Sequence, residues 1–315
     1  MSHTTVPALS RRCVSILSPL RYPGGKRRLA GYIAEALRLN RMRPRLYVEP
    51  FAGGASVALQ LLNDDHVERI ALGEKDPLVA AFWRTVFYDH AWLVRELRRI
   101  EPTLDAWNRF RNGRPRTDRA RALACIFLNR TSFSGILSAT AGPIGGQAQT
   151  SDYTIGCRFP VETIIKRIEQ AAALGDRVAF VHEGDWRETI ARANDLRIPP
   201  NRLLYYLDPP FYEKADRLYR YYFEEAEHQA LHNALARLRG RYILSYDAVA
   251  PIVELYSHNG IGPAQVEMLY SATRPGELLR ARELIVSNLP ELPRETRMWR
   301  TVEEWGRKEV LNEQS

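Results

Sequence analysis

The chain has 315 residues, of which 45% are hydrophobic, and a formal net charge of +8, values that suit one large globular domain or a core domain carrying an insertion. No stretch approaches the roughly 18 uninterrupted apolar residues of a membrane helix, so we expect no membrane contact. The three cysteines, Cys13, Cys125 and Cys157, lack the spacing of a zinc site or a disulfide framework, which indicates a reducing, cytoplasmic setting without metal.

Seven segments rich in β-branched and aromatic residues predict short strands. They are residues 45–51, 68–74, 177–185, 202–210, 241–247, 265–271 and 283–288. Helical patterns lie between many of them, at 56–63, 77–87, 161–174 and 224–238. Near-continuous apolar runs are typical of strands buried on both faces, and their alternation with helices predicts a doubly wound α/β fold. The last two strands have no helix between them, so we expect an antiparallel edge.

Residues 83–160 break this alternation, because they contain no convincing strand, several arginine-bearing helical pieces and a long polar loop. We predict an inserted, mainly helical subdomain there, with 1–82 and 161–315 forming the core domain. The insertion holds twelve arginines and six acidic residues, and residues 1–28 hold six basic residues and no acid. Two such basic segments indicate contact with a polyanion, nucleic acid first, or else a generally arginine-rich composition.

The segment YVEPFAGGASVALQLL (47–62) predicts a strand, a glycine turn and a helix. Gly53 and Gly54 let the backbone approach a ligand closely. Glu74 follows Gly54 by 20 residues, at the end of the next strand, where an acidic side chain typically binds ribose hydroxyls. The turn lacks the dinucleotide and phosphate-loop signatures, so with Glu49 facing it we expect a nucleoside-bearing ligand without a pyrophosphate. Alternatively, Glu49 and Glu74 cap neighbouring helices.

Two further segments flank this turn. The basic glycine loop PLRYPGGKRRLA (19–30) precedes a helix, and there Lys26 can meet a carboxylate while Tyr22 packs on a flat ring. The tripeptide GDW (184–186) follows a strand, so Asp185 points out of the carboxyl edge of the sheet, where open α/β sheets bind ligands.

Eight motifs in a fixed order resemble the DNA adenine-N6 methyltransferase family, in particular the class typified by the bacterial DNA adenine methylase that marks GATC. They are LRYPGGK, VEPFAGG, GEKD, LNRTSFSGI, GDW, LDPPF, SYD and ELIVSN, and they span residues 19–288. The resemblance implies a Rossmann-like, S-adenosylmethionine-dependent methyltransferase sheet, with 83–160 as its target recognition subdomain. The family's arginine-bearing segment after the recognition signature is absent, so the resemblance implies no particular recognition sequence.

The same resemblance implies roles for individual residues. Its cofactor-binding set is Tyr22, Lys26, Glu49, Pro50, Phe51, Gly53, Gly54, Glu74, Asp76, Asp185, Trp186 and Asp208. Tyr22 and Lys26 would contact the methionine part of S-adenosylmethionine. Glu74 and Asp76 would hold the ribose. Asp185 would bind the adenine with Trp186 packed nearby.

The resemblance also implies contacts with double-stranded DNA. The recognition signature consists of Asn129, Arg130, Phe133 and Gly135. A basic aromatic cluster that includes Arg217, Tyr219 and Tyr221 follows the LDPPF motif. This cluster would close over a flipped base or contact phosphates. Alternatively, its aromatic rings pack their own loop onto the core.

Asp208, Pro209, Pro210 and Phe211 are the candidate catalytic residues. The exocyclic N6 of adenine is a poor nucleophile because its lone pair is delocalised into the ring. The Asp208 carboxylate and a backbone carbonyl, that of Pro209, would accept both N6–H bonds and free the lone pair. The prolines stiffen this turn, and Phe211 offers a face to a base flipped out of the duplex.

Other functions fit parts of the same pattern. The tetrad also suits N4-cytosine methylation, since that amine has the same conjugation problem. The chain could instead be a catalytically silent DNA-binding component of a phage-defence system. For an active enzyme we expect a cytoplasmic, nucleoid-associated protein, with a restriction or defence-system protein as a further partner.

Overall fold

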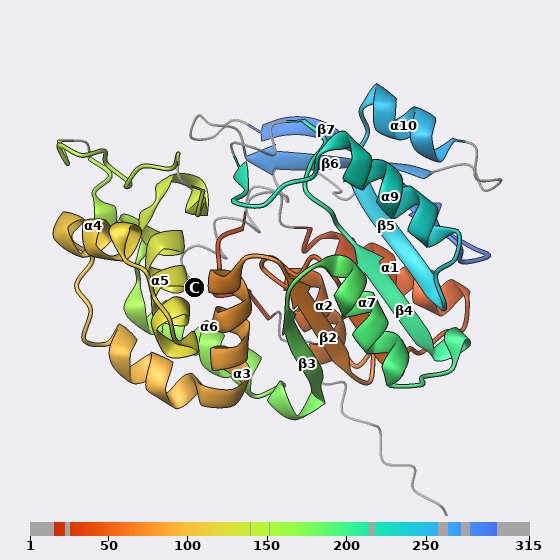
Figure 1. Ribbon diagram of the computed structural model, residues 1–315, viewed down its shortest axis with the longest axis horizontal. Coiled ribbons are helices and arrows are strands. Elements are labelled where there is room, and N and C mark those ends of the chain that lie inside the picture. The colour runs from red at the N-terminus through yellow and green to blue at the C-terminus, as the bar shows by residue number, and fades with distance from the viewer. Residues whose placement is uncertain are drawn as a thin grey trace, which may run out of the picture.

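The computed structural model describes residues 16–22, 26–138, 140–150, 152–213, 218–257, 264–271 and 278–294. Seven strands form one sheet in the order β3-β2-β1-β4-β5-β7-β6 (Figure 1). The strands are β1 (Leu46–Glu49), β2 (Ile70–Glu74), β3 (Val178–Glu183), β4 (Leu203–Leu207), β5 (Arg241–Asp247), β6 (Ala264–Ser271) and β7 (Leu278–Ser287). All seven predicted strands are confirmed, and β7 begins five residues before its predicted start.

The pairing of the strands confirms a mostly parallel sheet with an antiparallel edge. Strands β1 to β5 run parallel to one another, whereas β7 runs antiparallel to both β5 and β6. Strand β7 therefore lies one place in from the edge, and β6 is the outer strand. The strand order reverses between β1 and β4, and ligands of open α/β sheets bind at the carboxyl end of such a switch point.

Helices cover both faces of this sheet. They are α1 (Leu29–Leu39), α2 (Ser56–Asn63), α3 (Pro77–Leu97), α4 (Leu104–Asn112), α5 (Asp118–Thr131), α6 (Val161–Ala172), α7 (Trp186–Asp195), α9 (Glu225–Leu235) and α10 (Ala250–Tyr256). Successive strand residues point to opposite faces. On β1, Tyr47 packs with the apolar residues of α1, α2, α3 and α6, whereas Leu46 and Val48 pack with those of α7, α9 and α10. The fold is therefore a three-layer α/β sandwich.

The predicted insertion forms a helical lobe beside the sheet, with α4 and α5 at the left of Figure 1. Its predicted first boundary, at residue 83, falls inside α3, which runs through Leu97 with a kink at Asp89. Trp107 of α4 and Phe127 of α5 belong to the same hydrophobic core as the sheet residues. The lobe is thus packed onto the core domain through shared apolar side chains, and the division into two domains stays a proposal.

Within the described ranges, no helix is both long and apolar enough to cross a membrane.

Candidate active site

An open pocket lies at the carboxyl ends of β1 and β4, the switch point of the sheet. Most of the predicted cofactor and catalytic residues line it. Those that do are Tyr22, Lys26, Glu49, Phe51, Gly53, Gly54, Glu74, Asp208, Pro209 and Pro210, and the predicted DNA-binding residues Tyr219 and Tyr221 line it too. Motifs that are up to 200 residues apart in the sequence therefore meet in one cavity.

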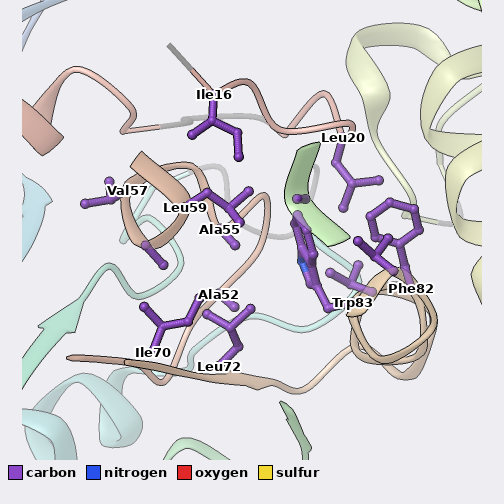
Figure 2. Close-up of a cluster of buried hydrophobic side chains, with 14 of the residues drawn as sticks. Ile16, Leu20, Ala52, Ala55, Val57, Leu59, Ile70, Leu72, Phe82 and Trp83 are labelled. Atoms are coloured by element: carbon purple, nitrogen blue, oxygen red, sulfur yellow. The ribbon is translucent and has the colours of Figure 1, made fainter. Parts of the chain in front are cut away.

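The glycine turn after β1 forms the floor of the pocket. Gly53 has a φ of +45°, and a Cβ there would come within 2.7 Å of the Tyr22 ring. The Gly53 N–H donates to Glu74 Oε2 at 2.9 Å, and its carbonyl accepts from the Trp83 indole N–H at 2.8 Å. Figure 2 shows the Trp83 side chain among the buried apolar residues around this turn, which include Ala52. The buried apolar side chains fix the position of the turn. Because Gly53 has no side chain, the space between the turn and the Tyr22 ring stays free.

Two carboxyl groups in the pocket are buried. Glu49 accepts a hydrogen bond from the Tyr47 hydroxyl at 2.9 Å, and burial raises the pKa of Glu49 to about 8. Glu74 accepts from the backbone N–H groups of Gly53 and Asp76, and burial raises the pKa of Glu74 to about 7. Burial disfavours the charged form of a carboxyl group, so both sites gain from a ligand that brings a cation or hydrogen-bond donors.

Asp76, the predicted helper of Glu74, has a different position. Its carboxylate caps α3 by accepting from the Leu78 N–H at 2.9 Å, and it forms an ion pair with Arg220 at 3.1 Å. Asp76 does not line the pocket, although its backbone N–H holds Glu74 in place. In this structure Asp76 supports the ribose-binding candidate rather than facing the cavity.

Asp208 follows β4 at the rim of the pocket and is held by side chains from two other segments. The Ser245 hydroxyl on β5 donates to Asp208 Oδ1 at 2.7 Å, and Ser245 itself is 2.8 Å from the Tyr206 hydroxyl. Lys26 Nζ lies 3.2 Å from the same Oδ1 atom. Lys26, predicted to meet the methionine carboxylate, thus forms an ion pair with the candidate catalytic acid here.

A second acid, Asp247 at the end of β5, fixes the loop after Asp208. Asp247 accepts hydrogen bonds from the backbone N–H groups of Tyr212 at 3.0 Å and Glu213 at 3.4 Å. Lys26 Nζ lies 4.8 Å from the centroid of the Phe211 ring. The turn Asp208–Phe211 is therefore braced from β5 on one side and from Lys26 on the other, which fixes its geometry.

Aromatic rings form one wall of the cavity. Tyr22 stacks on Tyr219 with 6.0 Å between ring centroids, and both rings line the cavity. Phe211, which does not line it, lies 6.0 Å from the same Tyr219 ring. Phe51 contacts Phe223 at 5.6 Å, edge to face. The flat apolar surfaces suit a heterocyclic ring.

Asp185 and Trp186 lie beside the cavity but do not line it. Asp185 caps α7, accepting from the Arg187 N–H at 2.9 Å and from the Arg187 guanidinium at 3.1 Å. Trp186 is buried, with its ring 6.4 Å from Phe51. Their adenine-binding role stays a prediction. Pro50 and Phe211 are likewise absent from the lining.

The recognition signature lies at the end of α5, and most of it contacts the protein's own chain. The buried Asn129 amide donates to the carbonyls of Arg21 and Gly135 and accepts from the Arg21 N–H, all within 2.8 Å. Arg130 is also buried and donates to the Pro19 carbonyl at 2.9 Å. Only Phe133 of the four presents an exposed side chain. Arg217 lies outside the described residues.

Sequence reasoning assigned no role to Ser245, Asp247 or Glu283, although their motifs SYD and ELIVSN were recognised. Glu283 on β7 is 1% exposed and lies 3.7 Å from Lys26 Nζ. Strand β7 runs antiparallel to β5, and Glu283 lies beside Asp247, the last residue of β5, at the carboxyl edge of the parallel strands. Sequence reasoning missed Glu283 because its position depends on the strand register that pairs it with Asp247, and the sequence alone does not show that register. Among the described residues, no group of three or more His, Cys, Asp or Glu could hold a metal ion.

The fold and the pocket together define a class of protein: a Rossmann-like methyltransferase, in which the glycine turn, the acid after β2 and the DPPF turn meet at the switch point. Within that class, the chain belongs to the D12 class N6 adenine-specific DNA methyltransferase family, whose model matches residues 22–269. The match confirms the family that the eight motifs indicated. A search among curated proteins gave no match.

Proposed function

We propose that this DNA adenine methyltransferase transfers a methyl group from S-adenosylmethionine to N6 of an adenine flipped out of double-stranded DNA, at a specific site. The observation that carries the proposal is the placement of Asp208. Its carboxylate stands at the rim of the pocket, fixed by Ser245 and Lys26 and followed by two prolines that also line the cavity.

The residues of the pocket fit S-adenosylmethionine. A Cβ on Gly53 would fill the space next to Tyr22, so the cradle depends on glycine. The buried carboxyls of Glu49 and Glu74 suit a ligand with an ammonium group, a positive sulfonium and ribose hydroxyls. Glu74 would hold the ribose, Glu49 and Tyr22 the methionine part, and Asp185 with Trp186 the adenine. When bound, the cofactor supplies an electrophilic methyl group.

The chain's own residues prepare the adenine. Asp208 and the backbone carbonyl of Pro209 accept the two N6–H bonds, which turns the nitrogen lone pair out of conjugation with the ring. Phe211 and Tyr219, with ring centroids 6.0 Å apart, offer aromatic faces on which the flipped base stacks. On transfer, N6 would bond to the methyl carbon as that carbon parts from the sulfur, and Asp208 would receive one N6 proton and pass it to solvent.

The helical lobe would supply the DNA contacts. It holds most of the basic segment 83–160, and the Phe133 side chain is exposed on it. Tyr221 is exposed at the mouth of the pocket, where it would meet the backbone of the flipped nucleotide. Contacts by Arg217, work in the cytoplasm at the nucleoid, and a restriction or defence-system partner stay predictions.

Methyl transfer by Asp208 variants tests the proposal. Tritiated methyl transfer to DNA from a methylation-free host is measured for the wild type, Asp208→Ala and Asp208→Asn. We expect a loss of at least about 100-fold in both variants, because a positioned acceptor in the transition state is worth that much or more. Because Asp208 also belongs to the predicted cofactor-binding set, calorimetry should show S-adenosylmethionine binding weakened, but far less than methyl transfer.

The methylated product shows whether the acceptor is N6 of adenine or N4 of cytosine. Nucleoside mass spectrometry of the wild-type product should show N6-methyladenine, and long-read sequencing should place it at one site. N4-methylcytosine as the product would contradict the adenine assignment. Methylation retained by Asp208→Ala would overturn the catalytic one, and absence of S-adenosylmethionine binding by the wild type would favour a catalytically silent DNA-binding protein.

A further inference from the structure

We propose that Glu283 is a positioning residue for methyl transfer: it shares the Lys26 ammonium with Asp208 and so keeps the second oxygen of Asp208 available to the adenine amine. The proposal rests on the proposed function, since it concerns how Asp208 is held for that reaction. Glu283 would act through Lys26 and would not touch the substrate.

The contacts place one buried ammonium between two carboxylates. Lys26 Nζ lies 3.2 Å from Asp208 Oδ1 and 3.7 Å from Glu283 Oε1. The side chains of Lys26 and Glu283 are 3% and 2% exposed, whereas that of Asp208 is 25% exposed toward the pocket rim. Glu283 is therefore shielded from solvent, and of the two acids only Asp208 can contact a substrate.

Both side-chain donors that reach Asp208 within the described part of the chain meet the same oxygen. Lys26 and the Ser245 hydroxyl both approach Oδ1, at 3.2 and 2.7 Å. Oδ2 is left to accept from N6. A lysine paired with Asp208 alone could swing between the two oxygens, because an ammonium is a compact charge on a flexible stem. Glu283 pulls it from the β7 side and fixes it at Oδ1.

Charge balance leads to the same conclusion. Asp208 and Lys26 alone would form a neutral pair, which offers little attraction to an amine that gains positive charge as it is methylated. With Glu283 the cluster carries one net negative charge, and a fixed negative charge near a developing positive one stabilises the transition state. The Lys26 ammonium offsets the charge of the buried Glu283 carboxylate, so the two residues depend on each other.

The sheet explains why Glu283 can do this. It pairs in register with Asp247 on β5, and the two acids brace the catalytic turn separately. Asp247 holds the backbone of Tyr212 and Glu213, whereas Glu283 holds Lys26, whose ammonium also lies 4.8 Å from the Phe211 ring. One antiparallel strand thereby controls the geometry of a turn on the parallel part of the sheet.

The test compares Glu283→Gln, Glu283→Asp and a control, Glu68→Gln. Glu68 forms an ion pair with Arg202 at the opposite, amino edge of the sheet. Single-turnover methyl transfer, calorimetric affinity for S-adenosylmethionine, DNA affinity and melting temperature are measured for each. We expect Glu283→Gln to lower the transfer rate about 10- to 100-fold, as small misplacements of reacting groups do, with both affinities within about threefold of wild type. Glu283→Asp should recover part of the rate, and Glu68→Gln all of it.

A double variant distinguishes positioning from general destabilisation. Glu283 acts only through Lys26, so Lys26→Met with Glu283→Gln should be no slower than Lys26→Met alone. Should Glu283→Gln fail to fold, the same comparison is made with Glu283→Asp. An unchanged rate in the single variant, or rate losses that multiply in the double variant, would overturn the proposal. Wild-type enzyme that yields no N6-methyladenine would instead contradict the proposed function itself.

Discussion

The DPPF turn and the LNRTSFSG segment are both motifs of this family, yet the structure uses their residues in opposite ways. In the turn, Asp208, Pro209 and Pro210 line the pocket and are braced from behind. In the segment, Asn129 and Arg130 are buried and bind the backbone of residues 19–21. A motif residue can therefore serve the ligand or the fold, and the partners of its polar atoms decide which.

The segment nevertheless affects the site. Asn129 and Arg130 hold the stretch that leads directly into Tyr22 and Lys26, which line the pocket. Gly135 has a φ of +72°, and a Cβ there would overlap the Arg21 carbonyl oxygen. The turn thus faces the pocket, and the segment joins the helical lobe to the loop that carries Tyr22 and Lys26 into the same pocket.

Removing the hydrogen bonds between the Asn129 amide and the backbone of Arg21 and Gly135, which we call the Asn129 clamp, should give the largest loss of stability. Asn129→Ala removes three hydrogen bonds and leaves buried backbone groups of Arg21 and Gly135 without them, so we expect a loss of about 2–4 kcal/mol of unfolding free energy. Chemical denaturation measures it. Methyl transfer should fall as well, because Lys26 follows the released loop.

The matched control for Asn129 is Asn63, a half-buried amide at the end of α2 that contacts Asp64. Asn63→Ala should cost less than about 0.5 kcal/mol. Equal costs for the two variants would mean that the Asn129 amide is not a clamp.

The difference between turn and segment also marks what the sequence could predict. Parallel strands end at one edge, so Glu74 at the end of β2 and Asp208 after β4 were expected near the glycine turn, and both lie there. The inward position of Asn129 was available too, since helical spacing sets it on the same face as the buried Cys125, four residues earlier. Glu283 was out of reach, because its place depends on how β7 pairs with β5, which no local pattern encodes.

The role of the buried carboxyl groups in the pocket can be tested by varying the pH. Burial raises the pKa of Glu49 to about 8 from an ordinary 4.5, so the folded protein binds a proton that the unfolded chain releases above about pH 4.5. Stability of the ligand-free protein should therefore fall as pH rises from about 4.5 to about 8. A cationic ligand favours the carboxylate, and S-adenosylmethionine binding at pH 7 should release roughly one proton.

Calorimetry in two buffers of different ionisation enthalpy measures that proton release. Glu49→Gln should remove most of it and flatten the dependence of melting temperature on pH. Glu74, whose pKa burial raises to about 7, should retain a smaller release in that variant. Binding by the wild type without any proton release would show that Glu49 does not meet the charged part of the ligand.

The role of the LNRTSFSG segment can be tested at Phe133, its exposed aromatic side chain. Phe133 is 53% exposed, unlike its buried neighbours Asn129 and Arg130, so Phe133→Ala should leave stability within about 0.5 kcal/mol of wild type. If the ring contacts DNA bases, its loss should weaken DNA binding by about 1 kcal/mol, or roughly fivefold. Tyr88 on α3 is equally exposed and interacts with Arg69 at the amino edge of the sheet, so Tyr88→Ala is the control that should bind DNA normally. Fluorescence anisotropy at fixed salt measures both. A Phe133 variant that binds like the control would leave the whole LNRTSFSG segment with a structural role, and DNA recognition would then have to come from other surfaces of the helical lobe.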